Sequence, residues 1–357
     1  MNWLCSLLII LVASCKPQVS TEKTKLNFLA YTTVPSTDIQ KAPFGGISGL
    51  VRVENNQYMA ISDDRSEYAP ARMIKLEINY ADLKLTVKPL SNIFLRDNGE
   101  LYKPNKIDTE AIAIKDDSFI ISSEGSYRKN SRTSPFIKIF SKTGNVKDVI
   151  EFNEERYIPQ KSGDMTRGVR PNLGFESLSI SPSKKFLFSV TEAALRQDAP
   201  DNYYDQNIVR LMRFDLENKN KVTEYAIKLD NVFHTEDGVE YNGSNGISDI
   251  LALSDREILF LERAWISKIK SQVVKIYKVK ISQNATVTDI PQLPKDVRVL
   301  KKKLIYDFEI SEKKPDNLEV LCFGPEINGK KTLIVASDNN FSEKQKNQFY
   351  LFEILSL

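Results

Sequence analysis

The sequence predicts an all-β fold: a β-propeller of five four-stranded blades, its ring closed by the N-terminal strand. Two observations predict it. After residue 25, helical periodicity is hard to find, and short runs rich in β-branched and aromatic residues alternate with turn residues. These runs also recur in the same order, which is typical of repeat-built propellers. A degenerate sixth blade would have room in 153–175 or 230–246, and a pair of β-sandwiches is the alternative fold.

The first strand of each repeat is short and combines small with aliphatic residues, which suits a crowded, fully buried position. Its marker residues are Gly49, Glu110, Glu176, Asp249 and Glu319. They follow one another at steps of 61, 66, 73 and 70 residues. This spacing predicts the innermost strands of five blades.

The remaining strands of each repeat follow in a fixed order. A second strand ends in a carboxylate 13 to 19 residues after the marker. Third strands are expected at 72–78, 136–142, 209–216, 273–281 and 348–354, and fourth strands at 85–95, 147–152, 222–229 and 303–310. The last repeat has no fourth strand of its own. The run from Leu26 to Val34 can supply it and close the ring.

The N-terminus has the pattern of an export signal. Residues 3–14 form an uncharged apolar run that ends in Val-Ala-Ser before Cys15, as in a bacterial lipobox. We expect residues 1–14 to be a signal peptide, Cys15 to be lipidated, 15–25 to be a tether and 26–357 to be the propeller. The protein would then be exported and lipid-anchored to a bacterial membrane, on the periplasmic or the outer side. An uncleaved anchor and a plain secretory signal are the alternatives.

Composition narrows the chemistry. The net charge is only +3 over 357 residues, which gives no case for nucleic-acid binding. A single histidine, His234, and three cysteines exclude most histidine-based and all multi-cysteine zinc sites. Any acid–base or metal chemistry must therefore come mainly from carboxylates.

The carboxylates of the repeats are expected to meet at one end of the ring. Because the second strand runs antiparallel to the first, the start of one and the end of the other lie side by side. The pairs are Glu110 with Glu124, Glu176 with Glu192, Asp249 with Glu262, and Glu319 with Asp338, and the first repeat adds Asp63. Nine carboxylates would thus converge on the rim of a central channel.

Such a rim predicts a cation site, because clustered carboxylates either raise their pKa values or recruit cations. Oxygen ligands favour Ca²⁺ over zinc. The candidate calcium ligands are Asp63, Glu124, Glu192, Asp249, Glu262 and Asp338, and the candidate catalytic residues are Glu110, Glu176 and Glu319. Arg65, Arg128 and Arg263 follow acids closely and are candidates for binding an anionic substrate. The alternative is that strand-end acids only cap turns and join blades.

The repeats resemble the phytase-like family named for the esterase-like activity of phytase. The resemblance rests on segments such as Gly46-Ile-Ser-Gly-Leu, Asp108-Thr-Glu110-Ala-Ile-Ala and Asn172-Leu-Gly-Phe-Glu176-Ser, and it spans roughly residues 44–353. It implies a propeller fold, export and hydrolysis of phosphoesters or esters, with calcium binding phosphate in an acidic channel. The matching first strands carry Glu-Ala, Glu-Ser and Glu-Val where the family has Glu-Gly.

Three functional interpretations remain open at this point. The first is a calcium-dependent phosphoester hydrolase that acts as a monomer on a small-molecule substrate and touches the membrane only through its lipid. The second is a non-catalytic propeller of the cell envelope that binds a ligand or partner. The third is a calcium-dependent lactone or ester hydrolase.

Overall fold

The computed structural model describes residues 25–128, 131–159, 166–199, 207–218, 221–231, 243–266 and 271–356. The predicted signal peptide, Cys15 and nearly all of the tether lie outside these residues, so they stay predictions. Within the described ranges, no helix is long and apolar enough to cross a membrane.

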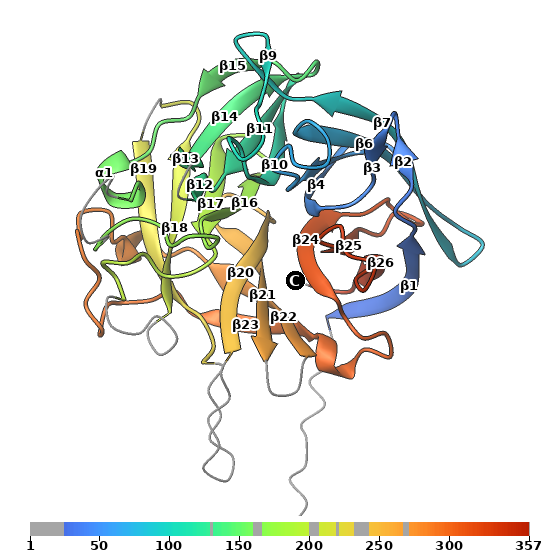
Figure 1. The fold of residues 1–357 in the computed structure, drawn as a ribbon. Coiled ribbons are helices and arrows are strands. Elements are labelled where there is room, and N and C mark those ends of the chain that lie inside the picture. Colours follow the sequence, from blue (N-terminus) through green and yellow to red (C-terminus); the bar gives the residue numbers. More distant parts are fainter. Residues whose placement is uncertain are drawn as a thin grey trace, which may run out of the picture.

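Five four-stranded antiparallel sheets form a ring (Figure 1). From the channel outward, blade one is β4 (Ile47–Glu54), β5 (Gln57–Ser62), β6 (Arg72–Ala81) and β7 (Lys84–Phe94), and blade two is β10 (Thr109–Lys115), β11 (Ser118–Ser123), β14 (Phe136–Ser141) and β15 (Val146–Val149). Blade three is β16 (Phe175–Ile180), β17 (Phe186–Thr191), β18 (Ile208–Asp215) and β19 (Lys221–Lys228). Blade four is β20 (Gly243–Ala252), β21 (Glu257–Ile266), β22 (Ser271–Lys280) and β23 (Lys302–Asp307).

The fifth blade closes the ring with strands from both ends of the chain. It consists of β24 (Asn317–Phe323), β25 (Thr332–Asp338), β26 (Asn347–Ile354) and, on the outside, β1 (Leu26–Val34). β1 pairs antiparallel with β26, from Leu26 opposite Ile354 to Val34 opposite Asn347. Ring closure by the N-terminal strand is confirmed, as are the all-β class and the five blades.

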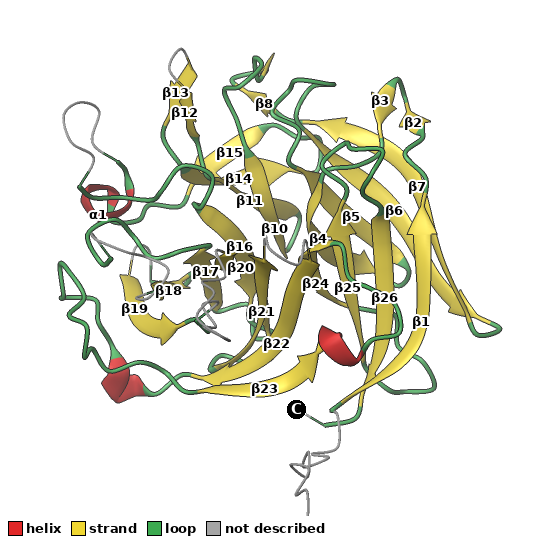
Figure 2. Cartoon of the chain, turned by 60° about the horizontal axis from the view of Figure 1, so that its bottom comes forward, coloured by secondary structure: helices red, strands yellow, loops and turns green. Residues whose placement is uncertain are grey.

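Short elements lie outside the blades. They are β2 (Asp38–Ile39), β3 (Ala42–Pro43), β8 (Arg96–Asp97), β9 (Glu100–Leu101), β12 (Ser126–Arg128), β13 (Ser131–Thr133), the helix α1 (Glu154–Tyr157) and the 3₁₀ turns η1 (Gln283–Ala285) and η2 (Phe308–Ile310). The pairs β2–β3, β8–β9 and β12–β13 gather at one end of the ring (Figure 2). No sixth blade is formed in the described part of the chain: 153–175 holds α1, and most of 230–246 is not described.

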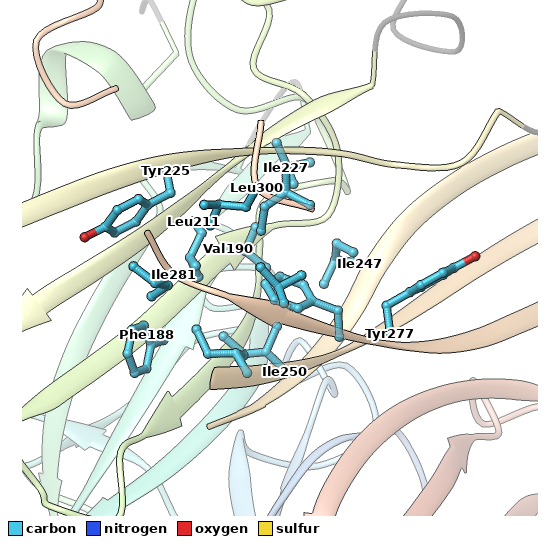
Figure 3. Packing of buried hydrophobic residues seen from close by; sticks show 14 of the residues in the cluster. Phe188, Val190, Leu211, Tyr225, Ile227, Ile247, Ile250, Tyr277, Ile281 and Leu300 are labelled. Atoms are coloured by element: carbon cyan, nitrogen blue, oxygen red, sulfur yellow. The ribbon is translucent and has the colours of Figure 1, made fainter. Parts of the chain in front are cut away.

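The core lies between neighbouring blades. Figure 3 shows the cluster between blades three and four, where Phe188 and Val190 of β17 face Ile247 and Ile250 of β20. These side chains are fully or almost fully buried, and each such burial stabilises the fold by about 1.5–3 kcal/mol. Because every blade packs on its neighbours in this way, the inner strands are held rigidly around the channel.

Candidate functional site

Every inner strand contains a β-bulge near its start. Two residues of the inner strand face one residue of the second strand at this point in all five blades. A bulge re-aims one side chain without ending the ladder. In blades two, three and five the re-aimed residue is a glutamate, Glu110, Glu176 or Glu319, and all three line one pocket.

In the other two blades the bulge residue is a serine that joins blades. Ser48 Oγ of blade one donates to the carbonyl of Thr109 at 3.2 Å, directly before Glu110. Ser248 Oγ of blade four donates to the carbonyl of Leu318 at 3.0 Å, directly before Glu319. Each serine therefore fixes the backbone that presents a pocket glutamate in the next blade.

The bulge residue defines the first of two ring positions in each blade, and the second ring position follows directly after the second-strand residue at which the bulge begins. The residues at this position are Asp63, Glu124, Glu192, Arg263 and Asp338. In the first three blades its backbone N–H donates to the residue that precedes the inner strand: Asp63 to Gly46, Glu124 to Asp108 and Glu192 to Gly174. This repeated bond holds the carboxylate against the start of its own inner strand.

In the fourth blade, the predicted alignment of the repeats is wrong by one residue. Its bulge places Ser248, not Asp249, at the position of the pocket glutamates. Asp249 is buried and accepts backbone N–H groups from Ile250 (2.8 Å) and Leu321 (2.7 Å). Glu262 pairs with Lys302 at 2.6 Å, and the pocket position falls to Arg263.

The convergence of nine carboxylates is therefore wrong in the fourth blade. Neither Asp249 nor Glu262 lines the pocket. The seven others do occupy the two ring positions: Asp63, Glu110, Glu124, Glu176, Glu192, Glu319 and Asp338. The assignment of Asp249 and Glu262 as metal ligands stays an untested prediction.

The ring positions surround a pocket of about 250 Å³ at the end of the channel. Its walls carry seven carboxylates: Asp63, Glu110, Glu176, Glu192 and Glu319 at ring positions, and Asp64 and Glu67 in the loop that follows β5. Glu124 and Asp338 are only 2% and 1% exposed and lie outside the lining residues. The pocket is thus strongly acidic, and part of its charge is buried.

Burial and mutual repulsion keep these carboxyl groups from ionising at their usual pH. Burial, reinforced by repulsion from Glu319, raises the pKa of Asp338 to about 8. Burial raises the pKa of Glu319 to about 7, although Arg263 beside it acts in the opposite direction. Burial followed by repulsion from neighbouring acids also raises the pKa values of Asp63, Glu110, Glu124 and Glu176 well above their ordinary values.

One trio of acids has the arrangement of a cation site. One carboxylate oxygen from each of Asp108, Glu110 and Glu124 lies within 4.8 Å of the others, and all three residues are buried. Three buried carboxylates this close cannot all ionise at low cost unless they share protons or hold a cation. Asp108 Oδ1 and Asp63 Oδ1 are buried without a hydrogen-bond partner among the described residues. This all-oxygen donor set fits Ca²⁺.

Two arginines stand against the acids on opposite sides of the pocket. Arg65 Nε lies 2.6 Å from Asp108 Oδ2, and its Nη2 lies 3.7 Å from Glu124 Oε1 and donates to Asn172 Oδ1 at 2.7 Å. Arg263 Nη2 lies 3.2 Å from Glu319 Oε1 and 3.5 Å from Glu192 Oε1. Both arginines line the pocket, and their role in binding an anionic substrate stays a prediction. The side chain of Arg128 lies outside the described residues.

An aromatic pair forms one edge of the pocket. Tyr68 and Phe341 both line it, with ring centroids 4.7 Å apart, and Tyr68 is 62% exposed. Asp64 shapes the loop under Tyr68 by accepting the N–H groups of residues 67–69 and pairing with the buried Arg72 at 2.6 Å. Phe341 has φ +49°, which is strained for a bulky side chain and typical of functional positions.

Sequence reasoning missed several of these residues. Asp108 was named only as part of a motif, although it lies two residues before the bulge residue, where Gly46, Gly174 and Gly246 lie in other blades. Tyr68 and Phe341 lie in loops without periodicity. The signal for Asp108 was available, because an acid in the place of a repeated glycine stands out once the repeats are aligned.

Gly174 leaves room for Glu124, and we predict that Gly174→Ala will disrupt the acidic trio. An added Cβ would lie 2.4 Å from Glu124 Cβ and 3.1 Å from its Cα. Overpacking of this kind costs about 1–3 kcal/mol. Chemical denaturation should reveal this loss, together with weaker calcium binding. Gly99→Ala is the control: its Cβ meets nothing within 4 Å, so only backbone strain at φ +83° is expected and calcium binding should not change.

The fold and the pocket define a five-bladed propeller with an acidic site at one end of its channel. The family model described as "Esterase-like activity of phytase", of the phytase-like family, matches residues 42–341. The chain therefore belongs to this family. No curated protein matches the sequence.

Similar solved structures are distant. An endo-arabinase from Bacteroides thetaiotaomicron VPI-5482 is 10% identical with a TM-score of 0.43, over 85% of this chain and 90% of that one. A bifunctional GH43-CE protein from Bacteroides eggerthii is 9% identical with a TM-score of 0.44, over 89% of this chain and 34% of that one. The Dos1 propeller is 10% identical with a TM-score of 0.34, over 87% and 69%. Similarities at this level carry no argument about activity.

Proposed function

We propose that this protein is a calcium-dependent hydrolase of small phosphate esters or related esters, acting in the acidic pocket. The observation that carries the proposal is the close approach of the three buried carboxyl groups of Asp108, Glu110 and Glu124, each of which offers an oxygen within 4.8 Å of the others. Such an arrangement is costly without a cation and is suited to hold one. Membership of the phytase-like family supports the same reaction class.

Each part of the pocket has a role in this proposal. Asp108, Glu110 and Glu124 would hold Ca²⁺, which supplies Lewis-acid chemistry at the ester group. Glu319, whose pKa is about 7, is suited to exchange a proton with water or the leaving group near neutral pH. Arg65 and Arg263 face the pocket with guanidinium groups that can orient an anionic ester. Glu176 also lines the pocket and is the second candidate for proton transfer.

A hydrolysis panel tests the proposal. Purified protein is assayed on aryl and alkyl phosphomonoesters, phosphodiesters and carboxylate esters, with Ca²⁺ and after chelation. We expect calcium-dependent release of product from at least one class. Absence of turnover on every class, while Ca²⁺ still raises the melting temperature, would favour the non-catalytic binding propeller instead.

The aromatic pair predicts a preference for substrates that carry a planar ring. Tyr68→Ala removes the exposed ring, and stacking of this kind is worth about 0.5–1.5 kcal/mol. We therefore expect kcat/KM for aryl esters to fall about threefold to tenfold and that for alkyl esters to stay the same. Tyr68→Phe keeps the ring and should behave as wild type. An equal loss of kcat/KM for aryl and alkyl esters would show that Tyr68 does not recognise the planar ring of the substrate.

The N-terminal pattern supports a further proposal about where the protein is located. We propose that the chain is exported and anchored through lipid on Cys15, on the periplasmic or outer face of a bacterial membrane, and that it acts as a monomer. The apolar run before Cys15 supports this. Mass spectrometry of membrane-extracted protein should detect a diacylglycerol-modified Cys15 at the mature N-terminus. Cys15→Ser should abolish the modification.

A further inference from the structure

The fourth blade departs from the pattern of the other blades at both ring positions. Blades two, three and five each present two carboxylates there: Glu110 and Glu124, Glu176 and Glu192, and Glu319 and Asp338. The fourth blade presents Ser248 and Arg263 instead. One blade thus carries positive charge where its neighbours carry negative charge.

Arg263 occupies the place of a carboxylate and joins acids of two neighbouring blades. One nitrogen, Nη2, lies 3.2 Å from Glu319 of blade five and 3.5 Å from Glu192 of blade three. The Arg263 side chain is only 16% exposed, so these contacts are little weakened by water. Bridging two carboxylates from separate strands is also what a bound calcium ion does.

The negative charge of the carboxylates is therefore compensated differently on the two sides of the pocket. Around Asp108, Glu110 and Glu124, a carboxylate oxygen remains buried without a partner. Around Glu192 and Glu319, a fixed guanidinium already lies between the acids. Arg65 does not remove the difference, because it pairs with Asp108 Oδ2 and leaves Oδ1 without a partner.

We infer that Arg263 is a built-in cation that replaces a second metal ion, so that the pocket binds one Ca²⁺ rather than two. The inference rests on the calcium site of the proposed function. The single ion lies at Asp108, Glu110 and Glu124, and Arg263 neutralises the opposite side. Its Nε is buried without a hydrogen-bond partner among the described residues, so it can donate to the anionic group of a substrate.

Calcium stoichiometry tests this inference without an activity assay. Calcium-free protein is titrated with CaCl₂ by calorimetry, and bound metal is counted by elemental analysis after dialysis. We expect one ion on the wild type and none on Glu110→Gln. Arg263→Glu, which restores the carboxylate of the other blades, and Arg263→Gln should each bind two. Arg263→Lys should bind one.

Arg256→Glu is the charge-matched control, because this exposed residue is remote from the pocket and should leave one ion bound. Thermal melting in calcium establishes that each variant is folded, and Arg263→Gln decides the question if Arg263→Glu does not fold. Two ions on the wild type, or one ion on both Arg263→Glu and Arg263→Gln, would overturn the inference. If the ion counts are as expected but no ester is hydrolysed, the proposed activity is overturned and the inference about Arg263 stands.

Discussion

Replacing Glu110 and Glu124 together by glutamine is expected to abolish both calcium stabilisation and hydrolysis. The wild type should gain about 3 kcal/mol of stability at a calcium concentration one hundred times its Kd. The double variant should gain none, because two of its three expected ligands have lost their charge. Hydrolysis should fall below detection, because the protein would no longer hold the ion that supplies Lewis-acid chemistry. Calcium-dependent melting and turnover on the best ester measure the two effects.

The same double variant should be more stable than the wild type when both are calcium-free at pH 8. Glutamine keeps the shape of each side chain and removes the repulsion by neighbouring acids that, after burial, raises the pKa values of Glu110 and Glu124. Glu100→Gln with Glu312→Gln is the control, since it makes the same charge change at two exposed positions. A double variant that still gains stability from calcium would remove the trio from consideration as the metal site.

Calcium-free protein is expected to lose stability as the pH rises from about 5 to about 8. The folded-state pKa values of Glu319 and Asp338 are raised to about 7 and about 8, whereas unfolded carboxyl groups titrate near 4. In this window the folded protein binds more protons than the unfolded chain, so the free energy of unfolding falls with rising pH. Most acids in proteins produce the opposite slope.

The expected size of the effect is a few kcal/mol, with about 3 kcal/mol from Glu319 alone. Urea unfolding at a series of pH values in chelator measures it. Glu319→Gln should make the fall shallower below about pH 7, and saturating Ca²⁺ should reduce it because the bound ion favours the ionised acids. Stability that rises with pH in chelator would mean that these carboxyl groups are not held protonated by burial.

Most of the fold could be predicted from the sequence because propeller strands are short, apolar and repeated. The inner strands at Glu110, Glu176 and Glu319 and the closing strand Leu26–Val34 were all identified correctly. The expected fourth strand at 303–310 ended too late: β23 stops at Asp307, and η2 follows. Apolar pattern does not distinguish a strand from a short turn of 3₁₀ helix that continues it.

The site was harder to predict because it depends on register. Ser248 and Asp249 are both polar, so the sequence does not reveal which one the bulge turns toward the pocket. A one-residue slip exchanges the two faces of a strand. The same slip assigned Glu262 instead of Arg263 to the ring, and thereby hid the single positive charge in it. The loops with Tyr68 and Phe341 have no period at all, and their place is set by contacts such as that of Asp64 with Arg72.

The most direct test of the central claim is turnover of an aryl phosphomonoester by the wild-type protein at neutral pH, followed through calcium addition, chelation and calcium return. We predict that product release begins with Ca²⁺, stops on chelation and resumes when Ca²⁺ is restored. The Glu110→Gln, Glu124→Gln variant should release none at any stage. Turnover that continues unchanged in chelator, or that the double variant retains, would contradict a calcium-dependent reaction in the acidic pocket.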